Sequence, residues 1–131
     1  MKVFLIRHAE AAPGEPDELR TLTEHGFAQA RELGKRLARE GVRPDAVLSS
    51  PLLRARETAD AIAKATGAEA EPIERLAPGA TADDLRDAVK GRGATVVVVG
   101  HQPDCSQIAA AVTGGPEPPF KPAGMLELEL E

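Results

Sequence analysis

Four short runs of apolar or β-branched residues recur along the chain, and helical stretches separate them. The runs cover residues 2–6 (KVFLI), 45–50 (DAVLSS), 95–100 (TVVVVG) and 125–130 (MLELEL). The first three are almost continuously apolar, which is typical of parallel strands buried on both faces. The fourth alternates apolar residues with glutamate, as an edge strand with one wet face does. A weaker fifth strand is predicted at 70–73.

Helices are predicted between these strands. The first, within 21–41, begins either at a capping box of Thr21 and Glu24 or at Thr23 as N-cap, and it ends at Gly41. The other three lie within 53–67, 81–93 and 103–115. Strands that alternate with helices predict an α/β fold. We expect a three-layer sandwich in one domain, 1–131, whose central sheet has about five mostly parallel strands, the last an antiparallel edge.

Composition excludes several kinds of function. The chain has 131 residues, a net charge of −5, three Phe and no Trp or Tyr. An acidic chain without aromatic platforms is a poor candidate for binding nucleic acid or a membrane surface. Cys105 is the lone cysteine and the N-terminus does not resemble a signal peptide, so a cytoplasmic location is expected.

Polar side chains follow three of the predicted strands. Arg7 and His8 end the first strand, Arg54 lies one turn into the helix after the second, and His101 ends the 95–100 strand. Ligands of open α/β sheets bind beyond the carboxyl ends of the strands, so these side chains should meet. Two guanidinium groups suit the oxygens of a phosphate or carboxylate. Paired histidines could instead bind zinc, but the arginines disfavour a cation and no metal is expected.

The segments that carry these residues resemble the three motifs of the histidine phosphatase superfamily. They are LIRHAEA, SSPLLRARETA and VVVVGHQP, in this order along the chain. The short length, RTLTEHG after the first motif, and GHQPD, which overlaps the end of the third, resemble the compact SixA-type branch of phosphohistidine phosphatases. The resemblance spans nearly the whole chain and implies a phosphoglycerate mutase-like fold.

The resemblance also implies roles for individual residues. His8 matches the nucleophile that attacks phosphorus and becomes phosphorylated before water releases phosphate. Arg7, Arg54 and His101 match the residues that bind the phosphate, and Arg20 matches an arginine at the pocket rim of the SixA-type branch. For attack, one nitrogen of His8 must be unprotonated, with the other expected to donate to a backbone carbonyl. The resemblance implies no cofactor.

A general acid is the part of the site that the sequence does not identify. Relatives that hydrolyse phosphate esters protonate the leaving oxygen with Glu or Asp. The candidates here are Glu10, two residues after His8, and Asp83 or Asp84. The two aspartates are also explained without catalysis, because acidic side chains stabilise the N-terminus of a helix. His25 and Cys105 are expected to be a solvated helix residue and a buried apolar group.

Three functions remain open at this level. The first is a phosphatase that acts on phosphohistidine of a partner protein, such as a phosphorelay or phosphotransfer protein, since a short chain without roofing insertions leaves the pocket open. The second is a phosphatase for small phosphorylated metabolites, which a clear acid near the pocket would favour. The third is a non-catalytic module that binds phosphoproteins.

Overall fold

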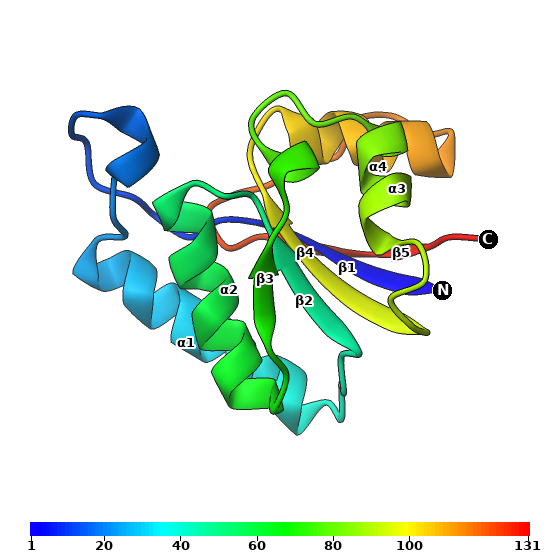
Figure 1. Ribbon diagram of the computed structural model, residues 1–131, viewed down its shortest axis with the longest axis horizontal. Coiled ribbons are helices and arrows are strands. Elements are labelled where there is room, and N and C mark those ends of the chain that lie inside the picture. The colour runs from blue at the N-terminus through cyan, green and yellow to red at the C-terminus, as the bar shows by residue number, and fades with distance from the viewer.

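The computed structural model describes residues 1–131 and contains one five-stranded sheet (Figure 1). The strands lie in the order β3-β2-β4-β1-β5. Their bounds are Lys2–Arg7 (β1), Ala46–Ser49 (β2), Ala70–Pro72 (β3), Thr95–Gly100 (β4) and Met125–Glu129 (β5). All five predicted strands are therefore present, including the weak one near residue 70.

The three continuously apolar runs form the middle of the sheet. Strand β4 pairs in parallel with β1 on one side and with β2 on the other. Residues 3–6 of β1 and 96–99 of β4 are buried, as expected for strands covered on both faces. Strand β5 runs antiparallel to β1 at the sheet edge, with Leu128 buried and Glu127 and Glu129 exposed. The predicted edge strand is confirmed.

Four α-helices cover the two faces of the sheet. Their bounds are Glu24–Arg39 (α1), Leu53–Thr66 (α2), Ala82–Val89 (α3) and Asp104–Thr113 (α4), with short 3-10 helices at Asp17–Leu19 (η1) and Glu74–Leu76 (η2). Helices α1 and α2 lie side by side against one face, and α3 and α4 lie on the other (Figure 1). Alternate residues of β1 supply the two cores: Phe4 and Ile6 face α1 and α2, while Val3 and Leu5 face α3 and α4. This is the predicted three-layer α/β sandwich.

The start of α1 corrects one of the two predicted caps. Thr23 is the N-cap, and its side chain accepts a hydrogen bond from the Gly26 amide. The Thr21–Glu24 capping box is wrong, because the Thr21 hydroxyl donates to the carboxylate of Glu57 on α2. The same carboxylate accepts from the amide of Leu22. This contact with α2 removes Thr21 from the helix start.

Close backbone packing holds the start of α1 against the segment that follows β1. The Thr23 amide donates to the Glu10 carbonyl at 3.0 Å. A Cβ atom added at Gly26 would collide with the same carbonyl oxygen, so only glycine allows the helix to approach this closely. The residues that follow His8 are thereby fixed between β1 and α1.

None of the helices combines the length and the apolar character that crossing a bilayer requires.

Candidate active site

A small hollow lies at the carboxyl ends of β1, β2 and β4. Its volume is about 240 Å³, and it is lined by Arg7, His8, Arg20, Arg54, Pro78, His101 and Gln102. A larger hollow of about 770 Å³ lies between α1 and α2, but it contains none of the residues predicted to act in chemistry. We assign the smaller hollow as the candidate site because three arginines and two histidines converge there.

The backbone of His8 is held from both sides. Its amide donates to the carbonyl of Gly100, at the end of β4, and its own carbonyl accepts from the amide of Ala123. Both contacts continue the hydrogen bonding of the sheet beyond the last residue of β1. The imidazole therefore projects from a rigid strand end into the hollow.

One ring nitrogen of His8 is left free to react. Nδ1 lies 2.7 Å from the carbonyl oxygen of Ala9. Because a carbonyl oxygen only accepts, Nδ1 must carry the proton, which leaves Nε2 unprotonated in the neutral ring. Burial lowers the pKa of His8 to about 4, and the positive charges of Arg54, Arg7 and Arg20 act in the same direction. His8 is therefore neutral near pH 7, in the tautomer that a nucleophile at Nε2 requires.

Arg7 is anchored by a distant segment of the chain. Its Nη1 donates to the carbonyl of Phe120 at 3.0 Å, and its backbone amide donates to the carbonyl of Gly124. Phe120 is itself buried in the core beneath α4. Nε of Arg7 is buried without a partner, which leaves this guanidinium with unsatisfied donor capacity beside the hollow.

Arg54 is placed by the first turn of α2 and is only 7% exposed. Its backbone carbonyl accepts a hydrogen bond from the hydroxyl of Thr58. The same hydroxyl oxygen of Thr58 accepts a hydrogen bond from the amide of Ala9. Since the Ala9 carbonyl accepts from His8, one chain of three hydrogen bonds links the histidine ring to the start of α2. The relative position of His8 and Arg54 is fixed by buried groups.

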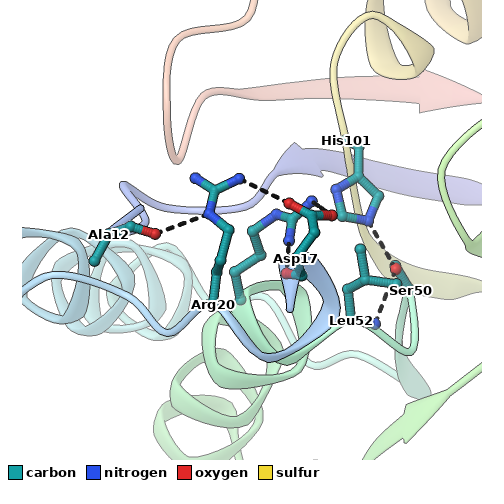
Figure 2. Close-up of polar contacts among 7 residues, drawn as sticks. Ala12, Asp17, Arg20, Ser50, Leu52 and His101 are labelled. Carbon is teal, nitrogen blue, oxygen red and sulfur yellow. Dashed lines mark hydrogen bonds and ion pairs between the residues drawn. The ribbon is translucent and has the colours of Figure 1, made fainter. Parts of the chain in front are cut away.

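Arg20 lies in the segment between β1 and α1 and lines the hollow; Figure 2 shows its contacts with Ala12 and Asp17. Its Nε donates to the carbonyl of Ala12 at 2.8 Å, and its Nη1 donates to the carboxylate of Asp17 at 3.0 Å. The second oxygen of the same carboxylate accepts from Nη2 of Arg54 at 3.3 Å. Asp17 therefore bridges the two arginines at the rim of the site.

His101 is packed beside His8 and is 4% exposed. The two ring centroids are 5.2 Å apart, in an edge-to-face arrangement. Nε2 of His101 shares a hydrogen bond of 2.7 Å with the hydroxyl of Ser50, drawn in Figure 2, while Nδ1 is buried without a partner. The pKa of His101 is lowered to about 4, mainly by burial and also by electrostatic interaction with His8 and Arg54.

The structure does not bring the candidate general acids to the site. The carboxylate of Glu10 is exposed and accepts from the Thr23 hydroxyl at 2.6 Å, so it supports the start of α1 instead. Asp84 completes the capping box of α3 with Thr81, and Asp83 pairs with Arg86 on the same helix. None of these three lines the hollow.

Two other side chains lie where the sequence placed them. His25 is exposed on α1 and contacts Gln29, one turn further along the helix. Cys105 is buried, and desolvation raises the pKa of its thiol to about 12, which makes the reactive thiolate inaccessible near pH 7. No group of three or more His, Cys, Asp or Glu side chains lies close enough together to hold a metal ion.

Sequence reasoning missed three residues that support the site: Asp17, Ser50 and Thr58. Ser50 and Thr58 carried a usable signal, because a polar side chain among the apolar residues of a buried strand end or helix face needs a specific partner. Asp17 carried none. It lies in a polar stretch rich in proline and glycine, where an exposed carboxylate has no predictable contact.

The two depressed histidine pKa values predict a pH-dependent stability. Unfolding returns both rings to a pKa near 6.5, so between about pH 6.5 and 4 the unfolded chain binds more protons than the folded one. The free energy of unfolding should therefore fall as pH drops through this range, by on the order of 1–3 kcal/mol. Urea unfolding at pH 7, 6 and 5 measures this change.

The carboxylates affect stability in a different, lower pH range from the two histidines. The pKa values of Asp17, Glu71 and Asp84 are lowered mainly by hydrogen bonds to arginine or to a helix cap, so their contribution is lost at lower pH, below about 4.5. In His101→Asn the slope between pH 6.5 and 5 should become shallower. A wild-type stability that stays flat from pH 7 to 5 would contradict the placement of both rings as neutral buried groups.

The sequence that carries most of this site matches a known family. Residues 3–78 match the model of the histidine phosphatase superfamily (branch 1), and the chain belongs to that superfamily. The matched segment includes Arg7 at the end of β1, His8 directly after it, Arg20 directly after η1 and Arg54 in α2. The family resemblance noted in the sequence is confirmed.

Solved structures similar to this chain include SixA proteins. The protein histidine phosphatase SixA complexed with tungstate has a TM-score of 0.90 and 27% identity, covering 100% of this chain and 89% of that one. A candidate phosphohistidine phosphatase SixA from Agrobacterium tumefaciens has a TM-score of 0.76 and 34% identity, covering 86% of this chain and 77% of that one. A phosphoserine phosphatase from Entamoeba histolytica, at 22% identity and a TM-score of 0.75, shares the fold.

Two curated relatives match this chain over very different shares of their own length. An uncharacterized protein of Picosynechococcus is 35% identical over 123 residues, which are 88% of this chain and 74% of that protein. The mitochondrial serine/threonine-protein phosphatase Pgam5 of Drosophila melanogaster is 40% identical over 76 residues, 57% of this chain but only 26% of Pgam5. The similarity to Pgam5 is thus confined to a minor part of that protein.

Proposed function

We propose that this protein hydrolyses phosphohistidine on a partner protein through a phosphorylated His8. Nε2 of His8 attacks phosphorus in line with the bond to the substrate imidazole, that P–N bond breaks, and the ring leaves with the electron pair. The other ring nitrogen of the substrate carries a proton, so the group that leaves is a neutral imidazole. Water then attacks the phosphoryl group on Nε2 and the Nε2–P bond breaks, with the electron pair returning to Nε2. This restores neutral His8, which keeps its proton on Nδ1, and both protons of the water leave on the phosphate as H₂PO₄⁻. Neither step needs a cofactor, because the residues that line the hollow supply the nucleophile and the positive charges.

The positive groups of the site supply the electrostatic part of this proposal. Arg7, Arg20 and Arg54 surround the hollow and stay charged at any working pH. We propose that these arginines and His101 hold the equatorial oxygens of the phosphoryl group, where negative charge is spread during transfer. The unpartnered Nε of Arg7 and Nδ1 of His101 support this role, because a buried polar atom without a partner is costly unless a ligand completes it.

The observation that favours phosphohistidine over phosphate esters is the absence of a carboxylic acid lining the hollow. An alkoxide is a poor leaving group and needs a proton from a general acid, whereas an imidazole is easier to expel. Asp17, at the rim, does not supply that proton. Its pKa is lowered, chiefly by the hydrogen bond from Arg20, so its carboxyl group is ionised near pH 7.

A comparison of substrates tests this proposal. We expect a phosphohistidine peptide to be hydrolysed with a kcat/KM about 10²-fold or more above that of phosphoserine or sugar phosphates, since a general acid contributes about 10²–10⁴. The same assay with a chelator present should show an unchanged rate, as a reaction without a metal ion requires.

Two outcomes would replace the proposal with one of its alternatives. A preference for sugar phosphates or phosphoserine would favour the small-phosphoester phosphatase, which the shared fold of the Entamoeba phosphoserine phosphatase keeps open. Tight binding of a phosphohistidine peptide without any turnover would favour a module that only binds phosphoproteins.

A further inference from the structure

Asp17 contacts two of the arginines that the proposed function assigns to the phosphoryl group. Its Oδ1 accepts from Nη1 of Arg20 at 3.0 Å, and its Oδ2 accepts from Nη2 of Arg54 at 3.3 Å. The side chain of Asp17 is 59% exposed, while that of Arg54 is 8% exposed. An exposed carboxylate from η1 thus occupies N–H groups of a nearly buried guanidinium at the rim of the hollow (Figure 2).

This carboxylate is not needed to hold either arginine in place. Nη1 of Arg54 donates to the backbone carbonyl of Asp17 at 2.9 Å, a contact that any residue at position 17 can make. Nε of Arg20 donates to the backbone carbonyl of Ala12 at 2.8 Å. Each guanidinium therefore keeps a backbone anchor when the Asp17 carboxylate is removed.

The effect of the carboxylate is instead one of charge. It lies close enough to the hollow for its negative charge to raise the pKa of His101, against the larger effects of burial, His8 and Arg54. An incoming anion would meet this charge and would have to take over N–H groups that Asp17 already occupies. Asp17 thus competes weakly with incoming anions for Arg20 and Arg54.

We propose that Asp17 is a specificity-determining residue, which yields Arg20 and Arg54 to a phosphoryl group and excludes anions of single charge. A phosphoryl group carries roughly −1.5 to −2 charges near neutral pH and presents three oxygens, whereas a carboxylate carries one charge and two oxygens. Only the former gains enough from the arginines to displace Asp17. This inference rests on the proposed function, because it takes the hollow to be the phosphoryl site.

Direct binding of orthophosphate and acetate to the full chain at pH 8, measured by calorimetry, tests the proposal. In Asp17→Asn we expect orthophosphate to bind about three- to tenfold more tightly than in the wild type. Acetate should compete with orthophosphate in this variant and not in the wild type. Asp17→Ala should behave in the same way, which separates the loss of the carboxylate from any hydrogen bond that a new amide makes.

Glu18→Gln is the matched control. Glu18 is the next residue of η1, is exposed, makes no ion pair or side-chain hydrogen bond, and its replacement removes the same charge. Weaker orthophosphate binding in Asp17→Asn would overturn the proposal, since it would mean that Asp17 orients the arginines. Equal tightening in Glu18→Gln would overturn it too, because the effect would be general charge. A wild type that binds no orthophosphate would contradict the proposed function itself, independently of Asp17.

Discussion

His8→Ala should lower the turnover of a phosphohistidine peptide by at least about 10⁴-fold. The nucleophile is the group that forms the new bond to phosphorus, and no other side chain in the hollow can replace it. His101 lies beside it, but its Nε2 shares a hydrogen bond with Ser50, and the proposed function uses its Nδ1 to donate to a phosphoryl oxygen. In the wild type, rapid quenching after addition of the substrate should trap phosphate on the protein in an acid-labile, base-stable form, and His8→Ala should trap none.

His25→Ala is the control for this experiment. His25 is the exposed histidine of α1 and lies outside the hollow, so its removal should leave turnover and phosphate trapping unchanged. The fold of His8→Ala is checked by its thermal unfolding, because a half-buried ring is lost from a polar pocket and the core is untouched. Undiminished phosphate release by folded His8→Ala would rule out His8 as the nucleophile.

Arg54→Lys should lower kcat/KM by about 10²-fold, although it keeps the positive charge. The planar guanidinium donates from Nη1 and Nη2 to Asp17 and still presents N–H groups to the hollow, which a lysine ammonium cannot do from one point. The lysine side chain must also place its charge at a position that is only 7% exposed in the wild type. We therefore expect both kcat and the affinity for orthophosphate to decrease.

Arg31→Lys provides the matched comparison for Arg54→Lys. Arg31 is exposed on α1 and makes no ion pair or side-chain hydrogen bond, so the same substitution should leave the kinetics unchanged. Steady-state kinetics with the phosphohistidine peptide and orthophosphate binding measure the two effects separately. If Arg54→Lys retained wild-type kinetics, the site would need only a positive charge at this position, and the fork geometry would be irrelevant.

The main features of the fold were predictable because they follow from local patterns. Continuous apolar runs identified β1 and β4, and the alternation in residues 125–130 identified β5 as an edge. Once these strands were placed, the carboxyl-end rule brought Arg7, His8 and His101 together. The structure does bring them into one hollow.

The details that were wrong or missed depend on contacts between distant segments. Thr21 and Thr23 both suit a helix start, and only the carboxylate of Glu57 on α2 decides between them. Glu10 is close to His8 in sequence, but its side chain is drawn to the Thr23 hydroxyl and away from the hollow. Such choices cannot be predicted from one segment alone, because each depends on the position of another.

The anchoring of His8 and Arg7 by residues 120–124 has a consequence for how the site forms. Phe120, Ala123 and Gly124 contact a strand end that precedes them by more than 110 residues. A ribosome makes His8 long before it makes residues 120–124, so these contacts cannot form until the segment that carries Phe120, Ala123 and Gly124 has been synthesised. The nascent protein should therefore acquire its reactive histidine geometry as one of the last events of folding, after most of the parallel sheet has assembled.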